Sequence, residues 1–465
     1  MTKFWHSTSG KLEFDPNNIL NFLKEQGFGV YQGRDLSGSM LVRVNQGIIS
    51  ITNRKEIRKY CFNYLEKYPF SDETERGTVK SSFVKVRFFT DDNLSLLDPI
   101  EVNELKDTES HSYLFFKNCI VKITPGTFEK YEYGQIQGNV FEKDIIDFEF
   151  EYTPELDLHS YRNDYWQFLE KICFHKDPEV ANKMFDSLMT IIGYLTCRYK
   201  DPAQSLAIIF SDQNDSGIPN GGTGKSLLAR SLGFVRNAVF ADGKQWNTNI
   251  RFWSSDVDYD TRIMVIDDIP SKFDFEKLFP IITERIVVER KYRDKITIDY
   301  RSSPKVVLTS NYVIAGEGFS HERRKLEFPL SNYFGPKRTP ETQFGKRMFE
   351  GWDKDQWQLF YNTIANAILC YLIRGIVHPP VNIHERNLKV VANPKFIEFM
   401  EGHFHPNVKT NKKDFYDAFY SQYPELSKVT LTTFRNWLNL YGKYVGYKLN
   451  DTHSGSDNFF EYSKG

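Results

Sequence analysis

The sequence predicts an α/β fold with a parallel sheet and flanking helices at its centre. Three observations lead to this prediction. Residues 205–233 run from an apolar segment through a glycine-rich loop into apolar residues at helical spacing. Two later segments, 263–268 and 305–311, each begin with branched apolar residues and end in polar ones. Short apolar runs of this kind are typical of parallel strands that are buried on both faces.

The composition limits the classes of protein to consider. A chain of 465 residues is too long for a single core and predicts about three domains. The net charge of −1 excludes a global basic field, so any surface for nucleic acid must be local. Five scattered cysteines without CxxC spacing predict reduced thiols, a cytoplasmic location and no zinc site. No apolar run reaches membrane-spanning length and the N-terminus is polar, so we expect no membrane contact.

Residues 1–153 are expected to form an N-terminal α+β domain. Asp15 followed by Pro16 is a typical helix start, and a second helix is expected at residues 55–68. Strands are expected around residues 40–44, 48–51, 83–89, 113–116, 120–123 and 148–152. Asp91 and Asp92 are adjacent and would not share one face of a strand, as a pair of metal-binding carboxylates requires. We therefore expect no intact primase site in this region.

Residues 154–200 are expected to form a helical collar. Trp166, Leu169, Ile172 and Cys173 recur at helical spacing, and a second helical run follows Asp177. Two interpretations are open: the collar is an oligomerisation surface, or it packs onto the next domain.

The glycine-rich loop of the third region, 201–335, has the context of a phosphate-binding P-loop: strand, loop, GK[ST], helix. Its amides and the helix N-terminus present positive partial charge to phosphate oxygens. Lys225 would neutralise β/γ-phosphate charge, and the Ser226 hydroxyl would bind Mg²⁺. Pro219 stands where the pattern has glycine, and Gly217 adds flexibility nearby. The predicted cradle consists of Asn220, Gly221, Gly222, Thr223, Gly224, Lys225, Ser226 and Leu227.

The apolar run at 263–266 ends in Asp267 and Asp268. Because a parallel strand places its C-terminal end at the ligand crevice, these carboxylates are expected beside the loop. Asp267 would hold Mg²⁺ through water, and Asp268 would orient or deprotonate the attacking water. The strand at 305–310 ends in Asn311, which would sense the γ-phosphate.

Two basic segments accompany these motifs. Residues 286–300 read as a β-hairpin whose tip carries Arg290, Lys291, Arg293 and Lys295. In a single chain such a tip is a solvated turn, whereas several in a ring would line a pore for a single strand. Arg323 and Arg324 lie in a second basic segment, and an arginine supplied by a neighbouring subunit stabilises phosphoryl-transfer charge.

The tail divides at a proline-rich break around residues 377–380. Residues 336–392 are expected to form a helical segment and linker. Residues 393–465 predict three helices and a terminal hairpin, the pattern of a winged helix, whose partner would be DNA or another protein.

The order of these motifs resembles superfamily 3 helicases, and especially the helicase part of phage, plasmid and poxvirus-type primase-helicases. P-loop, paired aspartates, basic hairpin, strand to asparagine and RRxLEF follow one another between residues 219 and 328. The resemblance implies an AAA+ ring, a hexamer, that uses ATP and Mg²⁺ to move 3′ to 5′ on single-stranded DNA during replication. By motif position, the pore contacts are Lys291 and Arg293, sensor 1 is Asn311, and the arginine finger is Arg324 or Arg323.

The sequence therefore predicts a ring-forming, ATP-dependent DNA helicase of a phage, prophage or plasmid-like element. Its expected partners are single-stranded and forked DNA, further copies of the chain, and a primase or polymerase. One alternative is an AAA+ origin-binding initiator or helicase loader that uses ATP as an assembly switch. Another is the helicase subunit of a primase-helicase.

Overall fold

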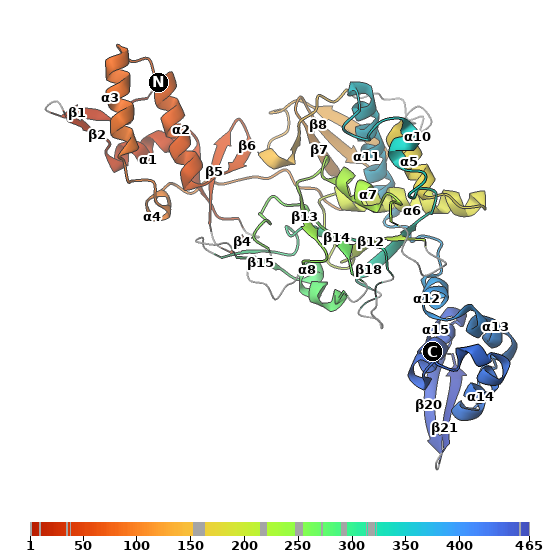
Figure 1. The fold of residues 1–465 in the computed structure, drawn as a ribbon. Helices are drawn as coiled ribbons and strands as arrows, with labels where there is room; N and C mark the ends of the chain where they lie inside the picture. The colour runs from red at the N-terminus through yellow and green to blue at the C-terminus, as the bar shows by residue number, and fades with distance from the viewer. Residues whose placement is uncertain are drawn as a thin grey trace.

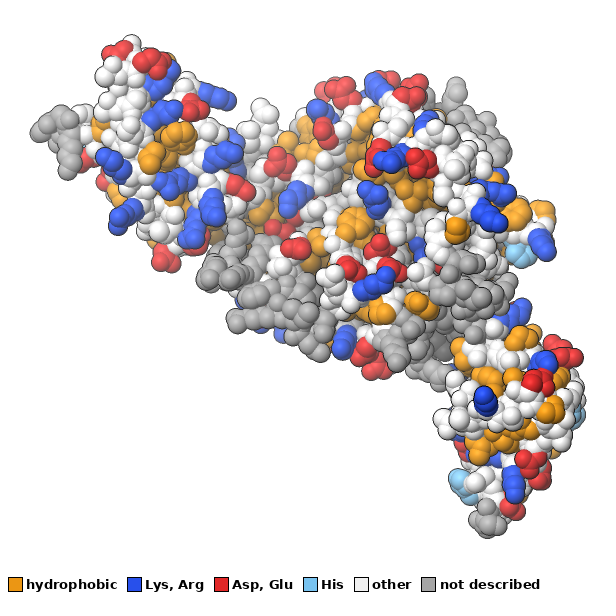
Figure 2. Space-filling model, viewed as in Figure 1, with side chains coloured by type: hydrophobic (Ala, Val, Ile, Leu, Met, Phe, Trp, Pro, Cys, Tyr) orange, Lys and Arg blue, Asp and Glu red, His pale blue; other side chains and the backbone are white. Residues whose placement is uncertain are grey.

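The computed structural model describes residues 2–8, 11–33, 36–37, 39–151, 163–213, 221–246, 254–270, 273–289, 295–312, 314, 321, 323–454 and 457–464. Figure 1 shows a central body with the first elements of the chain at one end and the last elements at the other. Acidic and basic side chains are interspersed over the face shown in Figure 2, in keeping with the net charge of −1.

The N-terminal elements combine helices and short strands, as expected. Asp15 and Asn53 cap the first two helices through their side-chain oxygens, which accept hydrogen bonds from backbone amides. The elements are β1 (His6–Thr8), β2 (Lys11–Glu13), α1 (Pro16–Glu25), β3 (Phe28–Tyr31), β4 (Leu36–Ser37), β5 (Met40–Asn45), β6 (Ile48–Ile51), α2 (Arg54–Lys67), α3 (Glu73–Val84) and α4 (Asp91–Leu94). Asp91 and Asp92 begin the short helix α4.

Two expected strands in this region are wrong. At residues 83–89 helix α3 continues to Val84 instead, because Val79 and Phe83, four residues apart, share its buried face. Residues 148–151 form no strand either. The side-chain amide of Asn118 occupies the backbone N–H and C=O of Phe150, which a neighbouring strand would otherwise bind. Its Oδ1 accepts from Phe150 N at 2.9 Å, and its Nδ2 donates to Phe150 O at 3.1 Å.

Two four-stranded sheets precede the central sheet: the first contains β3, β5 and β6, and the second small sheet belongs to the core of the central body. It consists of β7 (Ser112–Phe116), β8 (Ile120–Thr124), β9 (Thr127–Tyr131) and β11 (Ile145–Ile146), whereas β10 (Val140–Phe141) pairs with β6. Its buried residues Leu114, Phe116 and Val121 join the same hydrophobic cluster as the central sheet. The last third of the predicted N-terminal region is thus packed against the residues that follow it.

The central sheet has five parallel strands with helices on its faces, which confirms the predicted fold class. In spatial order the strands are β13 (Ala238–Asp242), β14 (Ile263–Ile269), β17 (Lys305–Ser310), β12 (Ala207–Asp212) and β18 (Lys325–Leu330). The P-loop strand β12 lies between β17 and β18. The paired aspartates are on β14, which lies on the other side of β17 from β12.

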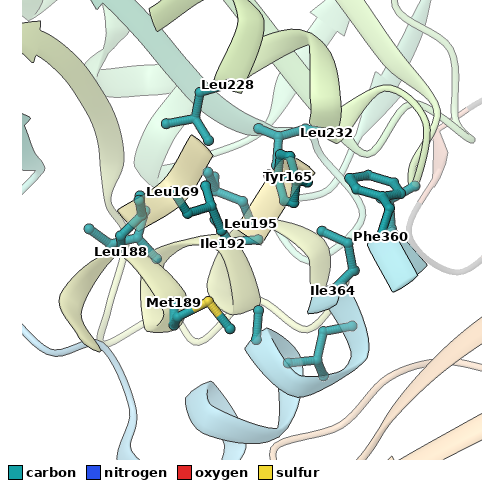
Figure 3. Close-up of a cluster of buried hydrophobic side chains, with 14 of the residues drawn as sticks. Tyr165, Leu169, Leu188, Met189, Ile192, Leu195, Leu228, Leu232, Phe360 and Ile364 are labelled. Atoms are coloured by element: carbon teal, nitrogen blue, oxygen red, sulfur yellow. The ribbon is translucent and has the colours of Figure 1, made fainter. Parts of the chain in front are cut away.

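The helices around this sheet are α5 (Asp164–Ile172), α6 (Pro178–Thr196), α7 (Lys225–Leu232), η3 (Phe275–Leu278), α8 (Phe279–Thr283), α10 (Pro340–Phe344) and α11 (Lys354–Arg374). Leu188 and Ile192 of α6 meet Ile364 of α11 and the P-loop helix α7 in one buried cluster (Figure 3). Helices α6 and α11 approach so closely that a Cβ on Gly193 would lie 2.0 Å from Ala367 O. The apolar side chains of α6 that belong to this cluster are therefore covered within the chain.

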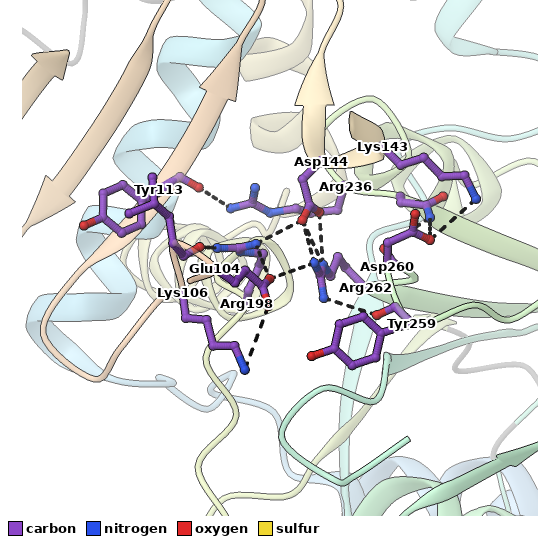
Figure 4. A network of polar contacts seen from close by, with 12 residues as sticks. Glu104, Lys106, Tyr113, Lys143, Asp144, Arg198, Arg236, Tyr259, Asp260 and Arg262 are labelled. Atoms are coloured by element: carbon purple, nitrogen blue, oxygen red, sulfur yellow. Dashed lines mark hydrogen bonds and ion pairs between the residues drawn. The ribbon is translucent and has the colours of Figure 1, made fainter. Parts of the chain in front are cut away.

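Six buried or half-buried charged residues join the second small sheet to the central sheet. This ion-pair cluster consists of Glu104, Asp107, Asp144, Arg198, Arg236 and Arg262 (Figure 4). Arg236 is only 2% exposed, and it donates to the carbonyls of Thr196 at 2.6 Å and Tyr113 at 2.7 Å. Burial alone would raise the pKa of Asp144, but Arg262 and Arg198 outweigh it and lower this pKa to about 2.

The predicted hairpin is present as the antiparallel pair β15 (Ile286–Val288) and β16 (Ile296–Ile298). Strand β4, from the N-terminal region, adds a third strand alongside β16. The tip at residues 290–294 lies outside the described residues.

The C-terminal body contains the predicted three helices and hairpin, with one further helix before them. Its sheet has the order β19-β21-β20. The elements are α12 (Ile383–Val391), α13 (Pro394–His403), β19 (Thr410–Asn411), α14 (Lys412–Gln422), η4 (Pro424–Leu426), α15 (Leu431–Val445), β20 (Lys448–Ser454) and β21 (Asp457–Ser463). Nowhere in the described part of the chain is a helix long and apolar enough to cross a membrane.

Candidate nucleotide-binding site

The described part of the P-loop bends sharply into helix α7. Gly222 and Gly224 have φ angles of +88° and +101°, in the left-handed region that glycine adopts without strain. Gly224 also needs to be small, because a Cβ there would lie 2.7 Å from Cε2 of the buried Phe168. The helix begins at Lys225. The predicted Asn220, with Pro219 and Gly217, lies outside the described residues, and Leu227 is a half-buried residue of the first turn.

Lys225 points to a carboxylate that the sequence motifs did not single out. Its Nζ forms an ion pair with Asp212 Oδ1, and the hydroxyl of Thr223 donates to the same oxygen. Lys225 Nζ also lies 3.2 Å from Thr223 Oγ1. All three residues are buried, so the lysine charge is balanced where water has little access. Asp212 is the last residue of β12, and its position at a strand end is the signal that would have identified it.

Ser226 and Asp267 lie together, as a shared Mg²⁺ requires. Ser226 Oγ donates to Asp267 Oδ1 at 2.9 Å, although 41 residues separate them in sequence. Thr309 Oγ1 donates to the same Asp267 oxygen at 2.5 Å and accepts from Asp268 N at 2.8 Å. One hydroxyl and one carboxylate are donors that Mg²⁺ accepts while it keeps several waters or phosphate oxygens. No cluster of three or more His, Cys, Asp or Glu side chains suited to a metal occurs among the described residues.

Asp268 is held by two neighbours. Asn311 Nδ2 donates to its Oδ1 at 3.0 Å, and Lys244 Nζ lies 2.5 Å from its Oδ2. The backbone of Asp268 has a φ of +58°, which is uncommon for a residue other than glycine. Asn311 follows β17 directly and so reaches the same sheet edge. Lys244 follows β13, in a segment without a recognised motif, and sequence reasoning missed it.

The two candidate arginines lie at the opposite edge of the sheet. Arg323 and Arg324 precede β18, whose first residue pairs with Ala207 at the start of β12. Five residues of β12 then separate that edge from Asp212, a span of about 17 Å at ~3.3 Å per residue. Arg324 packs over the ring of Phe279, with 4.5 Å from its Cζ to the ring centroid. Partial burial, and then the charge of Arg323, lower the pKa of Arg324.

The structure thus brings Lys225, Ser226, Asp267, Asp268 and Asn311 to one edge of the sheet and leaves both arginines at the other. Of the predicted pore contacts, Arg290, Lys291 and Arg293 lie outside the described residues. Lys295 is exposed at the base of the hairpin, 3.1 Å from Glu289.

Two of three comparisons with known proteins found a match. A family model described as "Family of unknown function (DUF5906)" matches residues 218–324, the segment from the P-loop to Arg324. No curated protein matches the chain.

The solved structures that match include two apo structures of the NrS-1 C-terminal region, both described as the A form. One apo structure covers 97% of this chain and all of that chain, at 13% identity and a TM-score of 0.40. The other, of residues 305–718, covers 96% and 99%, at 12% identity and a TM-score of 0.36. The JCV helicase, in complex with a small molecule, covers 51% of this chain and 64% of that chain, at 15% identity and a TM-score of 0.28. At these values the likenesses carry no conclusion about activity.

Proposed function

We propose that the chain is a P-loop ATPase that acts as a ring-forming DNA helicase of the superfamily 3 type. The observation that supports this most is the convergence of Lys225, Ser226, Asp267, Asp268 and Asn311 at one sheet edge. If these segments were ordinary surface turns, a lysine, a hydroxyl, two carboxylates and an amide from separate parts of the sequence would not be expected to lie together. These are the groups that phosphoryl transfer needs for positioning and charge stabilisation.

Each side chain has a distinct part in ATP hydrolysis. Lys225, at the start of α7, stabilises negative charge on the β- and γ-phosphates. Ser226 and Asp267 would hold Mg²⁺, which supplies further neutralisation of phosphate charge. Asp268 orients the attacking water, and Asn311 and Lys244 fix the carboxylate that does so. Thr309 ties both aspartates to the neighbouring strand, so that the two carboxylates keep their separate orientations.

The sheet geometry supports an arginine supplied by a second copy. Within one chain Arg324 lies about 17 Å from the P-loop edge, at ~3.3 Å per residue of β12. An arginine side chain cannot cover that distance, so its role as a finger requires a neighbour's site. The hairpin tips of such an assembly would face single-stranded DNA, with Lys291 and Arg293 as the proposed contacts.

The test uses the purified full-length chain, with ATP hydrolysis measured with and without single-stranded DNA. Lys225→Ala and Asp267→Asn should each abolish hydrolysis, whereas the control Lys183→Ala, which removes an exposed lysine from α6, should not. Strand displacement on forked DNA then separates a helicase from a loader, because a loader binds without processive unwinding. Lys291→Ala should retain ATPase activity and lose unwinding. A wild-type chain that hydrolyses no ATP under any of these conditions would refute the proposal.

A further inference from the structure

The P-loop lysine shares its charge with a buried carboxylate on the preceding strand. Asp212 is fully buried at the end of β12, and its Oδ1 accepts from both Thr223 Oγ1 and Lys225 Nζ. Both donors come from the loop that would hold phosphate. A carboxylate in that position brings a negative charge to a place where a phosphate-binding site needs positive charge.

We infer that Asp212 weakens the grip of this site on nucleotide phosphates, and so sets the affinity for ATP and the release of ADP. This inference rests on the proposed nucleotide site and adds a residue that regulates it. Lys225 can give its full charge to a phosphate only by giving up part of its ion pair with Asp212. The carboxylate also repels the phosphate directly, and burial of all three residues keeps water from screening that repulsion.

The size of the effect follows from Coulomb's law. Two unit charges about 5 Å apart, at an effective dielectric constant of about 20, repel by an amount worth roughly a hundredfold in affinity. Rearrangement of Lys225 between its two partners reduces this, so we expect the loss of the Asp212 charge to tighten ADP binding at least about tenfold.

The substitution Asp212→Asn separates charge from shape. Asparagine keeps an Oδ1 that can accept from Thr223 and Lys225, and it replaces the charged carboxylate by a neutral amide of nearly the same shape. A purely structural role for Asp212 predicts weaker ADP binding in this variant, because a neutral amide oxygen holds the lysine in place less firmly than a carboxylate does. The charge-sharing role predicts tighter binding, which general damage to the fold does not produce.

The experiment is isothermal titration of the full-length chain with adenosine, ADP and inorganic pyrophosphate. We expect Asp212→Asn to bind ADP and pyrophosphate at least about tenfold more tightly than the wild type, with unchanged affinity for uncharged adenosine. The control Asp242→Asn removes a carboxylate from the end of β13, at the same sheet edge, where it accepts from Lys244 N rather than from Lys225. It should change ADP affinity much less.

Equal or weaker ADP and pyrophosphate binding by Asp212→Asn would overturn the inference. So would tighter binding of adenosine, which carries no charge. If Asp212→Asn does not fold, Asp212→Ser, which keeps an acceptor for Thr223, gives the same prediction. A wild-type chain that binds neither ADP nor pyrophosphate would instead count against the proposed function itself, so the two failures are distinguishable.

Discussion

The substitution Gly224→Ala, which adds one methyl group, should impair nucleotide binding while the rest of the fold stays intact. The φ of +101° at Gly224 is strained for alanine, at a cost of roughly 1–2 kcal/mol. A Cβ would also lie 2.7 Å from Cε2 and 2.9 Å from Cζ of Phe168. Phe168 is fully buried and stacks on Phe334 at 5.7 Å, so it has little room to move. Overpacking of this kind costs a further ~1–3 kcal/mol.

Gly224→Ala should therefore destabilise the loop by about 2–5 kcal/mol and move the amides that would bind phosphate. The assay is the melting temperature of the full-length chain with and without ADP and Mg²⁺. We expect the variant to lose the ADP-induced rise. Gly77→Ala in α3, outside the loop, is the control, because no described atom lies within 4 Å of its added Cβ and its φ is not in the left-handed region.

A second change tests the cause. Phe168→Leu in the Gly224→Ala background should recover the part of the loss that comes from the clash and leave the part that comes from φ. If Gly224→Ala shows the wild-type ADP-induced rise, the reasoning about the loop is refuted.

Two further predictions concern Lys244 and Asp260. Lys244→Ala should lower kcat for ATP and leave KM within about twofold, because Lys244 contacts the side chain of Asp268 and orients it for the chemical step; an unchanged kcat in steady-state assays would contradict this. Burial raises the pKa of Asp260 to about 6, above the unfolded value of 3.8, although Lys143 opposes the shift. The folded chain therefore binds this proton more tightly, and the contribution of Asp260 to stability falls as pH rises from about 4 to 6, by about 3 kcal/mol in all. Asp260→Asn should raise the unfolding free energy relative to wild type at pH 7 but not at pH 4, and denaturant titrations at both pH values that show equal differences would contradict the assignment.

Much of the central sheet could be predicted from sequence because its strands are short, branched and apolar. The runs at β12, β14 and β17 each end in a polar residue, and their parallel pairing brings Asp267 and Asn311 to the edge where α7 begins. The glycines of the loop were recognisable because few other residues adopt such φ angles. The N-terminal strands were harder, since side chains such as that of Asn118 replace the backbone bonds that a strand would make.

The partners of the predicted site residues could not be predicted in the same way. Lys244 meets Asp268 only because β13 is hydrogen-bonded to β14, with Asp242 opposite Asp267. The arginines of the ion-pair cluster gave no signal, because arginine is rarely buried and nothing in a sequence marks the exceptions. Pairwise contacts across strands depend on strand order, which the motifs alone did not specify.

The central claim is that one copy of the chain provides the P-loop and a neighbouring copy provides an arginine. Lys225→Ala and Arg324→Ala subunits should each be inactive alone, with the arginine worth about 10³-fold or more in rate. Mixed together, they should regain ATPase activity, because some interfaces then join an intact P-loop to an intact Arg324. Mixtures that stay as inactive as the separate variants, or an Arg324→Ala chain with wild-type activity, would contradict the account.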